Sequence, residues 1–189
     1  MGDEKLERYE EYAYILDFLP QGRYDDKRIK KEPLALAIGD MEFKLFELII
    51  KPNVTPSIGD RVYIGKDIER RKEIHQIKRR ISYDELTPTA QVELPYVILQ
   101  IVREQEKRFV DFYNTAQPIT TRFHMLELLP GLGKKTMWAI IEERKKGPFT
   151  SFQDIMNRVK IHAPDKLIAE RIKLEVENPK EKYHLFVAK

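Results

Sequence analysis

The sequence predicts an α+β protein in which a small β barrel precedes an all-α domain. Short aromatic and β-branched runs, separated by glycine and proline turns, fill the chain as far as residue 83. Beyond that point apolar residues recur at helical spacing, and a Leu-Pro-Gly-Leu-Gly turn at 129–133 separates two helical segments. We therefore expect an OB-like or SH3-like barrel in residues 1–83, linking helices in 84–118 and the all-α domain in 119–189.

The barrel is expected from four or five short strands. Residue types favour strands at Tyr12–Leu19, Arg61–Gly65 and Glu73–Tyr83, and a Gly39-Asp40 turn divides the run LALAIGDMEFKLFEL into a hairpin. The polar segment PQGRYDDKRIKKEP is expected to be the loop after the first strand. Short strands with polar turns of this kind are typical of a small closed barrel.

Helices are expected from residue 87 onward. Thr87 and Pro88 suit the N-cap and first turn of a helix, and a long helix over ELPYVILQIVREQEKRFVDFYNTA should end at Gln117-Pro118. The later helices are expected from Thr120 or Thr121 through FHMLELL, over Lys134–Lys146, over FQDIMNRV with Thr150 or Ser151 as its cap, and over Pro164–Val176. The terminal EKYHLFVAK should be a strand or a docked tail.

Composition argues against several chemistries. The chain has no cysteine, which excludes disulfides and thiolate metal sites. The four histidines, His75, His124, His162 and His184, lack metal-binding spacing, and no Ser/His/Asp set can be named. The start MGDEKLERYEEY is too charged for a signal peptide, and no apolar run is long enough to span a membrane. We expect a cytoplasmic protein that is not an enzyme and takes no cofactor, metal or small-molecule substrate. A charged fraction of 34% is typical of a thermophile.

Positive charge is concentrated in two segments. Residues 66–80 carry 7 basic and 3 acidic side chains, and residues 117–189 carry 14 and 9. Such clustering indicates a nucleic-acid partner, although a solvated surface also explains it. In the first segment Lys78 and Arg80 share a strand face, from which they could follow a single strand. Tyr12, Tyr14 or Tyr63 could then stack on its bases, although core packing is the favoured role of these tyrosines.

The segment LPGLGKKT, residues 129–136, is the most informative part of the chain. It is not a nucleotide-binding loop, because Lys135 follows Gly133-Lys134 where Ser or Thr is needed and the preceding segment is helical. A turn before a helix leaves backbone N–H groups unpaired, here from Leu132 through Thr136, and the helix dipole favours an anion beside them. The segment therefore predicts a phosphate site assisted by Lys134 and Lys135. A simple turn is the alternative.

FHMLELLPGLGKKTMWAII resembles the helix-hairpin-helix motif over Thr121–Lys146. This resemblance implies that hairpin amides bind DNA or RNA phosphates without sequence preference. It also implies that K⁺ or Na⁺ could sit on the carbonyls of Glu127, Leu129 and Leu132. GPFTSFQDI and DKLIAERI resemble a second, degenerate copy that reaches about Val176, with VKIHAPDK in place of a Gly-x-Gly turn.

Nearly the whole chain is also similar to an archaeal family catalogued as a domain of unknown function, family 655, and described as predicted RNA-binding. QPITTRFHMLELLPGLGKKTMWAIIEERKKGPF and KYHLFV carry this likeness. The resemblance favours RNA over DNA as the partner of an uncharacterised binding protein.

The predicted nucleic-acid-binding residues are those of the turn and of the helix after it: Gly131, Leu132, Gly133, Lys134, Lys135, Thr136, Arg144 and Lys145. Arg144, Lys145 and Lys146 could equally stabilise the C-terminal end of their helix. Met137 and Trp138 are expected in the core rather than against a ligand.

Two other functions are compatible with the sequence. Helical hairpin domains also dimerise or bind proteins through apolar faces, which makes a protein–protein module the main alternative. A DNA glycosylase is a remote alternative. In its favour, Lys135 falls where bifunctional members of that family carry their Schiff-base lysine. Its required aspartate is replaced by Phe149, and Asp154 lies within a capped helix.

Overall fold

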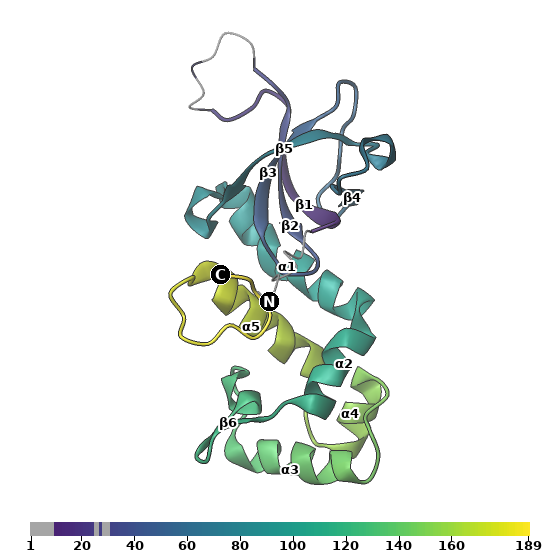
Figure 1. Ribbon diagram of the computed structural model, residues 1–189, viewed down its shortest axis with the longest axis vertical. Coiled ribbons are helices and arrows are strands. Elements are labelled where there is room, and N and C mark those ends of the chain that lie inside the picture. Colours follow the sequence, from purple (N-terminus) through teal and green to yellow (C-terminus); the bar gives the residue numbers. More distant parts are fainter. Residues whose placement is uncertain (1–9, 25–26, 28–30) are drawn as a thin grey trace, which may run out of the picture. The chain divides into compact units, whose positions relative to one another are not determined.

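The computed structural model describes residues 10–24, 27 and 31–189 (Figure 1). The charged start of the chain and part of the loop after the first strand lie outside these residues. The chain divides into two compact units, one formed by residues up to Val97 together with Glu175–Lys189, the other by Ile98–Leu174. The first unit contains the main sheet and the second the Leu-Pro-Gly-Leu-Gly turn. The protein is of the α+β class, as predicted.

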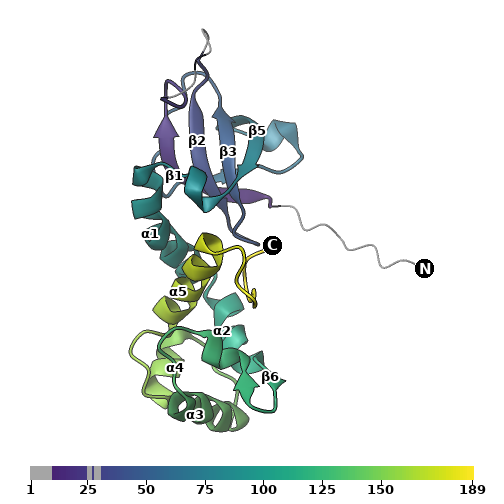
Figure 2. The same ribbon diagram turned by 90° about the vertical axis from the view of Figure 1, so that its left-hand side faces the viewer.

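The sheet of the first unit has five antiparallel strands. They are β1 Tyr12–Leu19, β2 Leu34–Gly39, β3 Leu45–Ile50, β4 Arg61–Tyr63 and β5 Ile74–Ile81. Their order is β4-β1-β2-β3-β5, and the sheet curls into a half-barrel (Figure 2). In the described chain the edge strands β4 and β5 do not pair with each other. A closed OB-like or SH3-like barrel is therefore not confirmed.

The inner strands β2 and β3 explain why this sheet forms. Every residue of LALAIG in β2 and of LFELII in β3 is buried, and a run that is apolar at nearly every position is the pattern of a strand covered on both faces. The half-buried Arg23 and the strand residues Lys78 and Arg79 surround the carboxylate of Glu47, which lies in the middle of β3. Their nitrogens lie 2.9, 3.6 and 3.2 Å from its oxygens. A buried carboxylate needs such partners to remain charged.

The long helix expected after Thr87 forms as two helices. α1 is Pro88–Glu104 and contains Pro95, and α2 is Glu106–Thr115. The hydroxyl of Thr87 accepts the N–H of Ala90, which confirms the predicted cap. The later helices are α3 Lys134–Lys145, α4 Phe152–Arg158 with Ser151 as its cap, and α5 Pro164–Glu177. All three lie close to their predicted bounds.

The prediction of a helix over FHMLELL is wrong. Pro118–Thr120 and Phe123–His124 form the short strands β6 and β7, and Met125–Leu128 form only a 3-10 turn, η3. The imidazole of His124 accepts the N–H of Leu126, and the carboxylate of Glu127 accepts the N–H of His124. Side-chain bonds of this kind compete with helical backbone bonds. The C-terminal part is consequently not all-α.

The C-terminal segment is a docked tail, one of the two alternatives predicted. The buried carboxylate of Glu175 accepts the backbone N–H groups of Leu185, Phe186 and Val187 at 3.0–3.1 Å. The N–H of Ala188 donates to the carbonyl of Glu42 in the sheet unit. The tail therefore belongs to the same compact unit as the sheet.

Candidate nucleic-acid interface

A tight turn joins η3 to α3 at the predicted hairpin. The N–H of Leu132 donates to the carbonyl of Leu129 at 3.1 Å. Gly131 has a φ of +82°, a left-handed conformation that a residue with a Cβ adopts only at a cost. Gly133 is the N-cap of α3, with φ −86° and ψ 174°, and provides no side-chain cap. The helix α3 therefore begins with N–H groups that no side chain of the N-cap residue accepts.

Five backbone N–H groups at this turn lack an acceptor within the described chain. They belong to Gly131, Gly133, Lys134, Lys135 and Thr136. The first N–H of α3 that is bonded internally is that of Met137, which donates to the carbonyl of Gly133 at 3.0 Å. Leu132 corrects the expectation, because its N–H is already used inside the turn and its side chain is buried.

The surface around the two glycines is open. A Cβ added at Gly131 or Gly133 would meet no atom within 4 Å. The φ of Gly133 is also one that any residue can adopt, so the described fold does not require glycine at this position. Glycine here leaves the backbone accessible from outside the protein, as it does where a ligand approaches closely.

Lys134 and Lys135 are both exposed but differ in their partners. The Nζ of Lys134 lies 2.8 Å from Oε1 of Glu127 and also reaches the carbonyl of Arg122. This bond, together with the His124 N–H, holds the pKa of the Glu127 carboxyl below its usual range. Lys135 forms no ion pair within the described residues. It is therefore the cation at the turn that is available to a ligand.

The predicted cations farther along α3 have internal partners. The guanidinium of Arg144 is half-buried and donates to the carbonyl of Tyr113 at 3.1 Å, and burial lowers its pKa. Lys145 pairs with Glu142, and Lys146 with Glu143, one turn earlier on the same helix. The predicted contact of Arg144 and Lys145 with phosphate has no direct geometric support.

Apolar contacts fix the turn and α3 together, and the residues expected to supply them are Leu126, Leu129, Leu132, Ile140 and Ile141. All but Ile141, which is half-buried, lie in the core, as does Met137. Trp138 does not, since 57% of its surface is exposed. The expectation that it lies in the core was wrong, because α3 turns this position toward solvent while Met137 and Ile140 face inward.

Sequence reasoning missed Arg158 as the residue that joins α3 to α4. Its guanidinium donates to the carbonyls of Glu143, Gly147 and Pro148 and pairs with the carboxylates of Glu143 and Asp154. Asp154 also accepts the N–H of Thr150, so its carboxylate takes part in the contacts at the start of α4. In the sequence, the one sign of this network is the single arginine of FQDIMNRV, Arg158.

The proposed second surface on the sheet is largely occupied. Tyr14 and Tyr63 are buried, as favoured, and the Arg70 guanidinium lies 4.2 Å from the centre of the Tyr63 ring. Arg61 lies 3.5 Å from the centre of the half-buried Tyr12 ring. Tyr12 and Tyr63 therefore stack on the protein's own arginines.

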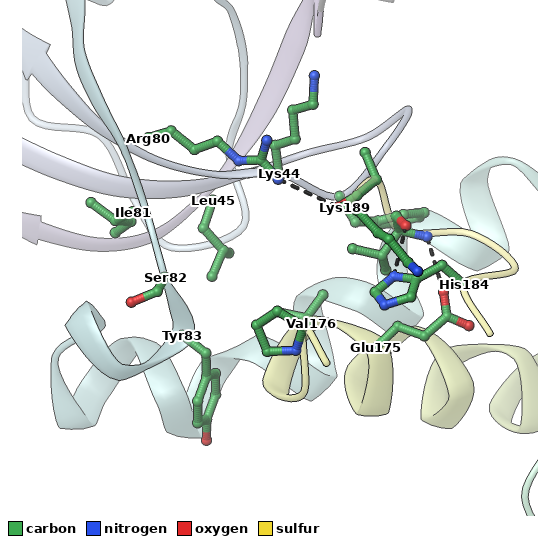
Figure 3. Close-up of a pocket in the computed structure, with 14 residues that line it drawn as sticks. Lys44, Leu45, Arg80, Ile81, Ser82, Tyr83, Glu175, Val176, His184 and Lys189 are labelled. Carbon is green, nitrogen blue, oxygen red and sulfur yellow. Dashed lines mark hydrogen bonds between the residues drawn. The ribbon is translucent and has the colours of Figure 1, made fainter. Parts of the chain in front are cut away.

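A separate pocket of about 350 Å³ lies in the sheet unit (Figure 3). Leu45, Arg80, Ile81, Val176 and the tail residue His184 line it, and the docked tail forms one wall. Nδ1 of His184 lies 3.0 Å from the carbonyl of Val187, whereas Nε2 is buried without a partner in the described chain. The pocket contains none of the residues predicted to bind phosphate at the Leu-Pro-Gly-Leu-Gly turn and along α3.

Two negative findings concern the described residues only. They include no group of three His, Cys, Asp or Glu side chains arranged to hold a metal ion. They also contain no helix of the length and apolarity needed to cross a membrane.

Comparison with known proteins supports the predicted family. A family model described as "Protein of unknown function (DUF655)" matches residues 9–188. "Uncharacterized protein MJ0038" of Methanocaldococcus jannaschii is 48% identical over 184 residues, which cover 97% of this chain and 82% of that protein. A crystal structure of Af1531 from Archaeoglobus fulgidus is 55% identical and has a TM-score of 0.88, covering 95% of this chain and all of that one. Both relatives are archaeal, and these descriptions name no enzymatic activity, ligand or partner.

Proposed function

The chain belongs to the DUF655 family of proteins of unknown function, and from this premise we propose that it binds nucleic acid without sequence specificity, with RNA favoured over DNA. The ligand is the phosphate backbone, held at the Leu-Pro-Gly-Leu-Gly turn. A cytoplasmic location is part of this proposal.

The observation that carries the proposal is the group of unpartnered N–H donors at the start of α3. Gly131, Gly133, Lys134, Lys135 and Thr136 supply five such donors in the described structure. The dipole of the 12-residue helix α3 adds partial positive charge at the same end. A phosphate oxygen is a strong acceptor with negative charge, so it suits both features.

Three further observations support a phosphate group that belongs to a macromolecule. Lys135 offers an exposed charge that is not neutralised within the described residues. The open space at Gly131 and Gly133 allows a bulky backbone to approach. The segment LPGLGKKT, on which the helix-hairpin-helix resemblance rests, also forms a turn followed by the helix α3, although η3 stands where the first helix of that motif would be.

Backbone donors explain the absence of sequence preference. Contacts to phosphate fix the position of a nucleic acid but do not read base edges. The preference for RNA rests on the resemblance to a family described as predicted RNA-binding. The K⁺ or Na⁺ site on the carbonyls of Glu127, Leu129 and Leu132 stays a prediction, and the Leu129 carbonyl already accepts one N–H.

The test is a binding titration against single- and double-stranded RNA and DNA at two salt concentrations. Lys135→Glu is compared with Lys166→Glu, an exposed lysine on α5. We expect binding at low salt, a steep decrease with salt, and loss of affinity in Lys135→Glu alone, because released counterions drive phosphate binding. Absence of binding to all four polymers at low salt would refute the proposal. Salt-insensitive association with a protein would favour the interaction-module alternative.

A further inference from the structure

Trp138 is an exposed aromatic residue one helical turn beyond the phosphate site. Of its surface, 57% is accessible, whereas the neighbouring Met137 and Ile140 are buried. It is also the single tryptophan of the chain. An indole this exposed has lost the benefit of apolar burial, so a partner that covers it would gain that benefit.

The surroundings of Trp138 are charged rather than apolar. Lys135 and Glu142 occupy the adjacent turns of the same face, and Glu142 is paired with Lys145. Among the described residues of this unit, Met156 is the other exposed large apolar side chain. Protein-binding surfaces usually present a contiguous apolar patch. A lone indole beside a lysine that has no ion pair among the described residues instead suits a flat, electron-rich group that carries negative charge nearby.

Helix geometry brings the indole and the free donors together. A helical side chain leans toward the N-terminus and covers the turn before its own position. For Trp138 that turn contains Lys134, Lys135 and Thr136, whose N–H groups are unpartnered in the described chain. One turn rises about 5.4 Å. A nucleotide whose phosphate sits on these donors can therefore place its base over the indole.

We infer that the partner of this site is a single-stranded nucleic acid, one of whose unpaired bases stacks on Trp138. This inference rests on the proposed function. Bases in a duplex present only their edges to the protein, whereas a single strand offers their faces. Stacking on an aromatic residue tolerates every base, which agrees with phosphate recognition that reads no sequence.

The fluorescence of the single tryptophan tests this inference directly. Short oligo(U) and oligo(dT) are titrated in parallel with RNA and DNA duplexes, and binding is followed independently by anisotropy of labelled strands. Trp138→Ala, Trp138→Phe and the control Met156→Ala are compared by anisotropy. Because the side chain is exposed, these variants should fold, and circular dichroism checks that they do.

We expect single strands to quench Trp138 as they bind. Trp138→Ala should weaken single-strand binding at least about fivefold, because a stacked base contributes roughly 1–3 kcal/mol. Trp138→Phe should retain most of the affinity, and neither duplex binding in Trp138→Ala nor single-strand binding in Met156→Ala should change.

Four results would overturn the inference. Binding of single strands without quenching, or equal losses for single strands and duplexes in Trp138→Ala, would refute stacking while leaving phosphate binding intact. Salt-insensitive self-association that depends on Trp138 would identify a protein contact instead. Failure of every polymer to bind by anisotropy would refute the proposed function itself, and the inference with it.

Discussion

The Nζ of Lys134 lies 2.8 Å from Oε1 of Glu127, so the residues on either side of the Leu129–Gly133 turn are paired with each other. The second oxygen of the same carboxylate accepts the N–H of His124 at 2.8 Å. Glu127 thus connects the start of η3 to the start of α3. It also places negative charge beside the donors that we propose for phosphate, and neutralises the nearer of the two lysines.

Replacing Glu127 with glutamine should strengthen nucleic-acid binding. The amide keeps an oxygen for the His124 N–H but removes the charge that opposes phosphate and occupies Lys134. We expect affinity for single-stranded RNA to rise about two- to fivefold at low salt, since exposed charge pairs contribute roughly 1 kcal/mol or less. Titrations by anisotropy measure the change.

The matched control is Glu170→Gln, which removes an exposed charge from α5. It should alter affinity less than Glu127→Gln does. An unchanged or lower affinity in a folded Glu127→Gln protein would mean that phosphate does not approach this side of the turn.

Stability of the hairpin should depend on pH through His124. Its Nδ1 accepts the N–H of Leu126 at 3.0 Å, which requires a neutral ring. Burial, with the charge of Arg144, lowers the pKa of His124 below its usual value near 6.5. The unfolded chain therefore takes up a proton before the folded one does. Stability is fully present above about pH 6.5 and falls as the pH decreases through the lowered folded pKa.

Urea denaturation followed by Trp138 fluorescence measures this dependence. The substitution His124→Asn supplies an oxygen in place of Nδ1 and has no titrating group near neutral pH. We expect its denaturation midpoint to vary less between about pH 7.5 and 5 than that of the wild-type protein. Equal variation in both proteins would show that another group controls the pH dependence.

The strands and most helices could be predicted because local patterns determined them. The buried runs LALAIG and LFELII form strands that their composition predicts, and Thr87 and Ser151 cap their helices through ordinary side-chain bonds. The prediction over FHMLELL was wrong because the spacing of its apolar residues suggests a helix. Its conformation depends instead on two specific bonds made by His124 and Glu127.

The candidate site was predictable where backbone geometry decides it, and less so where side chains do. Gly131 and Gly133 in LPGLGKKT indicate a turn with free N–H groups, and five N–H groups at this turn have no acceptor among the described residues. The pairing of Lys134 with Glu127 and the inward direction of Arg144 depend on tertiary packing. Trp138 was misplaced because a large aromatic residue on an amphipathic helix is usually buried, and only the rotation of α3 decides its exposure.

The most direct test of the account is to cap α3 from within the protein. Gly133 already has the extended conformation of an N-cap residue and lacks only an acceptor side chain. In Gly133→Asp and Gly133→Asn the new side chain can accept the N–H of Lys135 or Thr136, which should stabilise the helix by roughly a few tenths of a kcal/mol, because glycine is itself a fair N-cap residue. Asn adds the acceptor without the charge.

Denaturation and anisotropy on the same samples give stability and affinity for single-stranded RNA together. If backbone donors hold the phosphate, both variants should gain stability, and both should lose affinity about tenfold or more, with Gly133→Asp affected most. If Gly133→Asn is stabilised yet binds RNA as well as the wild-type protein, the N–H groups at the start of α3 are not the phosphate site.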